Sequence, residues 1–164
     1  VLDRDGPLCH CGMRGCLEAY CGGRSVAERL KRTMRESPVR EILDMPGVDG
    51  DLDKLDYLKL REAVHQNVPF AVQFWDEVCM RLAQGIGIHM MSFNPELIVL
   101  GTLAVYSGEL LMSRVRHYLP QFVWPSVLSA CQIQPAALGS DIGELSGPCV
   151  ALDGLLEQGK WQPW

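Results

Sequence analysis

The stretch "PFAVQFWDEVCMRLAQGIGIHMMSFNPELIVLG", residues 69–101, decides the fold class because its hydrophobic pattern changes along its length. Pro69 suits the first turn of a helix, and apolar residues then recur every four positions, which predicts a long helix with a wide apolar face. Asn94 and Pro95 mark a turn. The continuous apolar run at 97–100 predicts a strand buried on both faces.

Two glycines interrupt the long helix near its end. Gly85 and Gly87 each cost roughly 1 kcal/mol relative to alanine, so close packing of the helix on a sheet is the expected compensation. His89 lies near the apolar face, and we interpret it as a core or edge histidine.

The flanking sequence alternates between helix and strand patterns. A helical pattern breaks at Gly22 and Gly23, with Ser25 as a candidate N-cap of the second helix. The remaining expected elements are a helix at 16–36 with that break, a surface excursion at about 37–55, a helix at 57–66, a helix at 108–119, a strand at 130–134 and a final helix within 139–159. Gly143 and Gly147 would allow the final helix to pack closely. Helices with buried strands between them predict an α/β fold.

Composition restricts the classes of function. The 164 residues suffice for one domain, and the net charge of −5 argues against a nucleic-acid surface on this segment. Basic residues at 29–40 alternate with acidic ones, which predicts a solvated helix face. Apolar runs are too short for a membrane span, and no secretory signal is visible, so we expect a cytoplasmic protein without a membrane partner. The start "VLDRDG" lacks an initiator Met and is interpreted as the start of a fragment.

The chain has seven cysteines, and three of them are concentrated in "CHCGMRGC". An odd number without a secretory signal indicates a reducing compartment. Cys9, Cys11 and Cys16 could converge because Gly12 and Gly15 let the backbone fold back tightly. Zinc favours thiolates but takes four tetrahedral ligands, and these cysteines supply three. Zinc binding is the favoured interpretation, and three unligated thiols in a tight turn are the alternative.

The fourth ligand stays open at this stage. His10 stands between two candidate ligands and should point away from them, whereas Cys21 is a weak candidate on the following helix. A histidine upstream of Val1 would serve better.

Three segments together resemble one known family. The segments are "DGPLCHCGMRGCLEAYCGG" (5–23), "FNPELIVLGTLAV" (93–105) and "PAALGSDIGELSGPCVAL" (135–152), and in this order they resemble the C-terminal part of the ROK family of repressors, open reading frames and sugar kinases. The resemblance covers nearly the whole chain and corresponds to the second half of a family member. It implies the second lobe of an actin-like, ribonuclease-H-like ATPase fold, with a mixed sheet, packed helices and an N-terminal zinc knuckle. Residues 1–164 would form this C-terminal ROK domain, with the zinc loop at 9–16, and the N-terminal lobe would lie outside the chain.

The resemblance assigns roles to residues near the cysteines. Cys9, Cys11 and Cys16 match the family's zinc thiolates, whose fourth partner is an upstream histidine. Glu18 matches a glutamate that binds sugar hydroxyls. The chemistry agrees, since a carboxylate accepts hydrogen bonds from two hydroxyls and is favoured in a first helical turn. The zinc would then be structural, a clip that positions Glu18. Without the cysteines, a plain helix-start acid would be the better interpretation.

The resemblance also indicates a nucleotide site and its limits. Gly101 matches the start of a glycine segment that approaches the nucleotide, but this chain reads "GTLAVYSGE" where kinases commonly carry two or three glycines. The phosphate loop and catalytic aspartate belong to the upstream half, so no catalytic residue is expected here. The implied function is an ATP- and Mg-dependent hexokinase, glucokinase-like and homo-oligomeric, whose fragment alone is inactive. The alternative is a sugar-responsive repressor without kinase activity.

Overall fold

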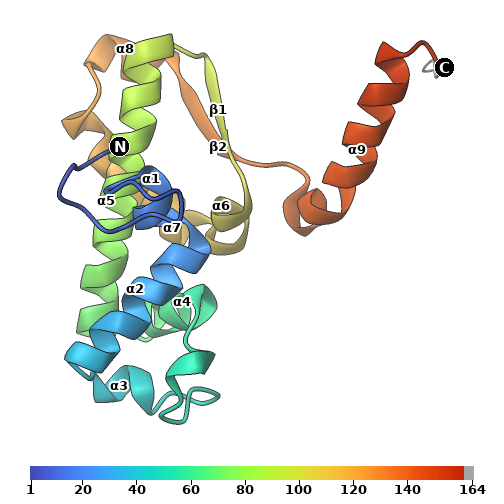
Figure 1. Cartoon of the computed structure of the whole chain (residues 1–164). Helices are drawn as coiled ribbons and strands as arrows, with labels where there is room; N and C mark the ends of the chain where they lie inside the picture. The colour runs from blue at the N-terminus through green and yellow to red at the C-terminus, as the bar shows by residue number, and fades with distance from the viewer. Residues whose placement is uncertain (161–164) are drawn as a thin grey trace.

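A computed structural model describes residues 1–160 of the chain, apart from the side chains of Ser140 and Ile142. Figure 1 shows a helical body with a small sheet on one side and a last helix that projects away from it. The elements are α1 (Leu17–Cys21), α2 (Gly23–Glu36), α3 (Arg40–Leu43), α4 (Tyr57–His65), α5 (Pro69–Phe93), β1 (Leu97–Leu100), α6 (Thr102–Ser107), α7 (Glu109–Tyr118), α8 (Pro125–Ala130), β2 (Gln132–Pro135) and α9 (Ile142–Glu157), with 3-10 turns at Leu52–Lys54, Leu119–Gln121 and Gly139–Asp141.

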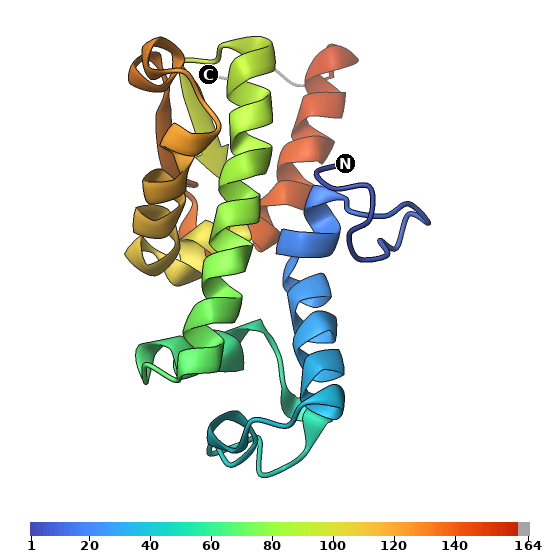
Figure 2. The ribbon, with the colours of Figure 1, turned by 90° about the vertical axis from the view of Figure 1, so that its left-hand side faces the viewer.

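The long helix α5 is the centre of the body, with α1, α4 and α7 packed against it (Figure 2). It starts at Pro69, as the sequence predicts, and runs to Phe93. Asn94 caps it in the left-handed conformation, at the predicted turn. Close packing does occur at its glycines, but the neighbours are not a sheet. A Cβ at Gly85 would lie 2.8 Å from Leu17 Cδ1 of α1, and one at Gly87 would lie 2.7 Å from Phe122 Cβ.

The core lies between α5 and the helices around it. Its largest fully buried side chains include Trp75, Leu30, Met34, Leu60, Met90, Leu111 and Met112. Segment 37–55 takes part as well, because Ile42, Met45, Val48 and Leu55 are all at most 2% exposed. The segment 37–55 is therefore held to the rest of the protein by its own buried side chains.

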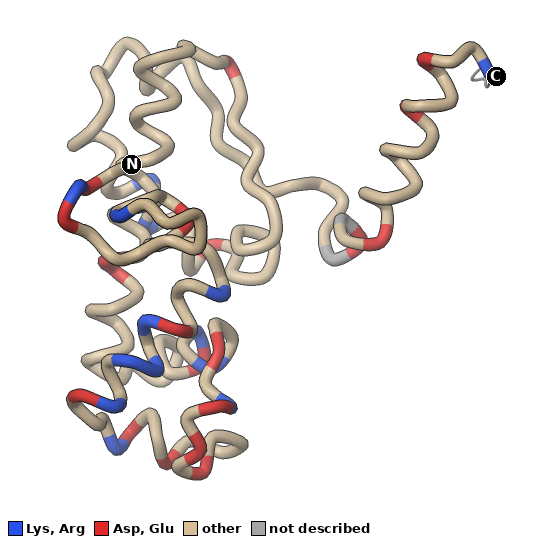
Figure 3. The backbone as a smooth tube through the Cα atoms, viewed as in Figure 1, with Lys and Arg blue, Asp and Glu red and all other residues tan. Residues whose placement is uncertain are grey.

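The helix break at the glycine pair is confirmed, and two details near it differ. Gly22 caps α2, whereas Ser25 lies inside the helix and is buried. Charged residues do concentrate on α2 (Figure 3), but Arg29 is not part of a solvated face. Its side chain is only 12% exposed, and its guanidinium is paired with Glu77 and stacks on the ring of Phe74. The helices α6 and α8 were not expected from the sequence.

The sheet consists of β1 and β2, which pair in parallel with Leu97 opposite Gln132 and Leu100 opposite Pro135. The helices α6, α7 and α8 form the crossover that parallel strands need. The predicted α/β class is confirmed, but the described sheet is parallel rather than mixed. The prediction that β1 is buried on both faces was also wrong for residues 1–160, since Leu97 is 49% and Val99 56% exposed.

The last helix α9 leaves the body (Figure 1). A Cβ added at Gly143 or Gly147 would meet no atom within 4 Å, so the expected close packing is absent from the described residues. Val150 is 74% exposed. In the part of the chain that the structure describes, every helix is too short or too polar to cross a membrane.

Candidate functional site

The cysteine segment forms a tight hairpin just before α1. The backbone N–H of Cys9 donates to the carbonyl of Met13 at 2.8 Å, and that of Gly12 donates to the carbonyl of Cys9 at 2.9 Å. Gly12 and Gly15 have φ angles of 88° and 64°, which non-glycine residues rarely adopt. The two glycines therefore allow the reversal that the sequence analysis expects of them.

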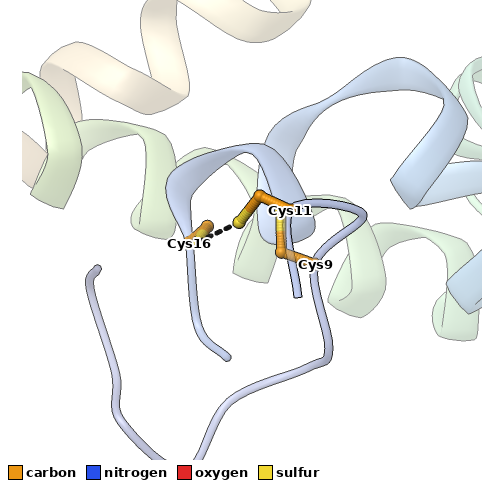
Figure 4. Close-up of side chains that lie close together, drawn as sticks. All are labelled: Cys9, Cys11 and Cys16. Atoms are coloured by element: carbon orange, nitrogen blue, oxygen red, sulfur yellow. Dashed lines mark hydrogen bonds between the residues drawn. The ribbon is translucent and has the colours of Figure 1, made fainter. Parts of the chain in front are cut away.

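The three cysteines that the sequence singles out converge at this hairpin (Figure 4). The sulfur atoms of Cys9, Cys11 and Cys16 all lie within 4.8 Å of one another, and the Cys11 and Cys16 sulfurs are 3.6 Å apart. Thiolates bound tetrahedrally to one zinc at about 2.3 Å would be roughly 3.8 Å apart. The donor set and its spacing therefore fit a thiolate-binding metal such as zinc, with one position left for another ligand.

The sulfur atoms of the hairpin also interact with one another. A hydrogen bond from the backbone N–H of Met13 lowers the pKa of Cys11. The hydrogen bond between Cys16 and Cys11 raises the pKa of Cys16 to about 11.

The two fourth-ligand candidates within the chain lie elsewhere. His10 points to Glu28, with its Nε2 3.2 Å from a carboxylate oxygen. Cys21 is buried, lies 3.5 Å from the carbonyl of Val78, and has a pKa raised to about 12 by burial. Neither belongs to the cluster found among the described residues.

Glu18 occupies the first turn of α1, two residues after Cys16. Its carboxylate folds back over the end of the helix, so that a Cβ at Gly22 would lie 1.9 Å from Glu18 Oε1. Gly22 thus provides the space in which this carboxylate sits. The side chain is exposed and free to meet a ligand.

A pocket of about 480 Å³ opens beside this carboxylate. It lies between the α1–α2 junction and the start of α6, and its lining includes Glu18, Gly22, Gly23, Gly101, Thr102 and Leu103. Its volume is within the range of small-molecule sites, about 300–1,000 Å³. The structure thus brings Glu18 and Gly101, which are distant in sequence, to the walls of one pocket.

Sequence reasoning missed part of this lining. Gly22 and Gly23 were interpreted as a helix break alone, although the doubled glycine also leaves backbone exposed to a ligand. Leu103 crosses toward them, with its Cδ2 3.5 Å from the place of a Gly23 Cβ. The side chain of Leu103 therefore lies across this pocket, opposite the glycine pair.

Comparison with known proteins gives a consistent result. The model of the ROK family matches residues 1–148. A glucokinase of Thermotoga maritima is 27% identical over 92% of this chain and 46% of its own length. A xylose repressor of Bacillus spizizenii is 23% identical over 96% of this chain and 36% of its own length.

Solved structures agree with this result. A ROK family glucokinase from Streptomyces griseus, in complex with glucose and AMPPNP, superposes with a TM-score of 0.70 and 27% identity over 85% of this chain and 45% of that one. A ROK family transcriptional regulator, a homolog of the E. coli MLC protein, shares the fold with a TM-score of 0.64 and 20% identity. The chain spans about half the length, or less, of these relatives.

Proposed function

This chain belongs to the ROK family, and we propose that it is the sugar-binding lobe of a glucokinase-type kinase. The complete protein would transfer the γ-phosphate of ATP to a hydroxyl of a hexose such as glucose. The related glucokinases support the choice, since one of them was solved with glucose and a nucleotide analogue. Cytoplasmic location and homo-oligomerisation stay predictions.

One observation carries the proposal: the carboxylate of Glu18, which directly follows the cysteine hairpin, lines the same pocket as Gly101. A carboxylate can accept hydrogen bonds from two neighbouring sugar hydroxyls, and bonds to charged acceptors are the stronger ones. Gly101, without a side chain, would let the phosphate end of a nucleotide approach the same space. The role of this lobe is to hold the two reactants near each other.

The metal would have a structural role. Cys9, Cys11 and Cys16 would bind one zinc ion together with a ligand from outside the described chain. When bound, zinc would cross-link the hairpin and so stabilise the folded loop. Because Glu18 begins the helix that follows Cys16, a fixed hairpin also fixes the place from which its carboxylate projects.

Phosphoryl transfer depends on positioning and on charge stabilisation around a metal-bound nucleotide. The groups that perform it, a phosphate-binding loop and a catalytic base, would lie in the other half of the protein. In this chain, Glu18 would orient the acceptor sugar, and the apolar side chains Leu17 and Leu82 would keep water from that side of the pocket. The chain alone would therefore bind but not react.

The second candidate is a sugar-responsive repressor without kinase activity. The observation that favours it is Leu103, which narrows the pocket beside Gly101 where a nucleotide would enter. Repressors also occur among the relatives. In that case the same Glu18 site would sense a sugar, and DNA-binding helices would lie in the upstream sequence.

A coupled assay of the full-length protein separates the two candidates. With ATP, Mg²⁺ and a panel of hexoses, a kinase should show sugar-dependent ADP release with at least one hexose. No turnover with any hexose, together with tight sugar binding and an upstream helix-turn-helix, would reject the kinase and support the repressor.

A further inference from the structure

The carboxylate of Asp3 joins three separate parts of the molecule. Its Oδ1 accepts a hydrogen bond from the backbone N–H of Asp5 at 3.1 Å. Its Oδ2 accepts from the hydroxyl of Tyr20 at 3.1 Å and from the guanidinium of Arg81 at 3.3 Å. The bonds thus connect the N-terminal segment to α1 and to α5.

Tyr20 is held tightly at this junction. Its side chain is 4% exposed, and the guanidinium of Arg81 lies 4.5 Å from the centre of its ring. A Cβ at Gly6 would come within 2.5 Å of the Tyr20 hydroxyl, so that the N-terminal segment closes over it. Burial raises the pKa of Tyr20, and the hydroxyl therefore remains a hydrogen-bond donor at neutral pH.

The backbone at Asp3 is in direct contact with the end of the cysteine hairpin. Leu2 donates from its backbone N–H to the carbonyl of Gly15 at 2.7 Å. The carbonyl oxygen of Asp3 lies 1.5 Å from the place where a Gly15 Cβ would be, so the two backbones lie in direct contact. Gly15 precedes Cys16, and therefore a shift of Asp3 moves a candidate metal ligand.

We propose that Asp3, Tyr20 and Arg81 form a positioning tie that orders the cysteine hairpin before metal binds and aligns it with Glu18. The proposal rests on the function proposed above, because it concerns the same site. Such a tie matters for the hairpin because its residues 10–14 are exposed, so that burial contributes little to their order. None of the three residues touches the metal or the sugar; they act by lowering the cost of ordering the hairpin on binding.

Removing a single hydroxyl tests the tie. Tyr20→Phe in the full-length protein keeps the buried ring but deletes the hydrogen bond to Asp3. Zinc affinity, measured by competition with a chromophoric chelator, should fall about tenfold, the typical effect of one hydrogen bond to a charged group. Sugar affinity, measured by calorimetric titration at limiting zinc, should fall in parallel.

Tyr118→Phe is the matched control. It also deletes a tyrosine hydroxyl that donates to a carboxylate, but here the acceptor is Asp76 of α5 and the bond lies where α7 packs on α5. This variant should match Tyr20→Phe in lost stability and leave zinc and sugar affinity unchanged. If the two variants have equal zinc affinities, Tyr20 contributes to stability alone and the proposal is overturned.

Saturating zinc gives a readout that a general folding defect would not show. Because bound metal orders the hairpin by mass action, excess zinc should return the sugar affinity of Tyr20→Phe to within about twofold of wild type. Asp3→Asn, which leaves the ring and its packing untouched, should behave in the same way. Sugar affinity that stays low at saturating zinc in both variants overturns the tie. A wild-type protein that binds sugar but no zinc overturns it as well, and leaves the sugar site standing.

Discussion

The two ends of the chain meet the rest of the molecule in opposite ways. The N-terminal hairpin and α1 lie against α5, with Tyr20 and Cys21 both 4% exposed. In contrast, β1 keeps two side chains about half exposed, and α9 projects into solvent with Val150 74% exposed. The helix α1 is thus covered by described residues, whereas β1 and α9 are covered only in part or not at all.

The difference shows that the hydrophobic pattern of a strand or helix reports the burial of the complete fold. The apolar run of β1 is typical of a strand covered on both faces, yet the described residues cover one. The helix α9 exposes several apolar side chains, among them Val150, Leu152 and Leu156, and a helix with so many apolar residues is expected to be covered. We therefore expect the complete protein to cover β1 and α9, and the predictions below probe each region.

The largest expected effect concerns activity. The 164-residue chain should show background turnover with ATP and every hexose, because the phosphate loop and catalytic base are predicted to lie outside it. The full-length protein, assayed alongside, should turn over its substrate several orders of magnitude faster than this chain. Sustained turnover by the 164 residues would place the active site wholly within the described regions and contradict our division of the lobes.

The next effect concerns the metal. Full-length protein should contain about one zinc per chain by elemental analysis, and Cys11→Ser should contain almost none, because two thiolates are too few for a structural site. Cys149→Ser, on the exposed α9, is the control and should keep its zinc. A wild-type protein that is stably folded without metal, or a disulfide among Cys9, Cys11 and Cys16, would refute the structural zinc site.

The contrast in burial predicts a contrast in stability. Leu111→Ala, at a side chain 0% exposed between α7 and α5, should lower the free energy of unfolding by about 2–5 kcal/mol. Leu155→Ala on α9, where the side chain is 39% exposed, should cost less than about 0.5 kcal/mol in the 164-residue chain. Urea unfolding measures both.

The same pair of variants sharpens the comparison in the full-length protein. There the cost of Leu155→Ala should rise above about 1 kcal/mol, because burial by the added half makes this side chain part of a core. An unchanged cost would mean that α9 stays exposed in the complete protein.

Local patterns in the sequence were sufficient for the parts that depend on local physics. The start of α5 at Pro69, its end at Asn94 and the hairpin at Gly12 and Gly15 follow from backbone preferences, and all three are found. The convergence of the three cysteines also follows from spacing. These features need no distant partner.

Features that depend on tertiary contacts could not be predicted in this way. Nothing in the sequence around Asp3 or Arg81 predicts that they contact Tyr20, because the three residues meet only when α1 packs on α5. The shared pocket of Glu18 and Gly101 likewise appears only in the fold. The partial burial of Arg29 was not predicted from the alternating charges around it, because Phe74 and Glu77, which contact its guanidinium, come from α5.

The central claim is that Glu18 binds sugar hydroxyls, and calorimetric titration of full-length Glu18→Gln tests it most directly. The substitution keeps the shape but replaces one charged acceptor oxygen with a donor. A hydrogen bond to a charged group contributes about 1.5–3 kcal/mol, so sugar affinity should fall roughly tenfold to a hundredfold. ATP affinity should fall far less, because a carboxylate makes its hydrogen bonds to the sugar hydroxyls and not to the phosphates, which are acceptors themselves.

Glu41→Gln serves as the control, because Glu41 is also an acidic residue in a first helical turn but lies outside the pocket. It should bind sugar as wild type does. Equal sugar affinity in Glu18→Gln and Glu41→Gln would show that Glu18 is a plain helix-start acid and would contradict the account.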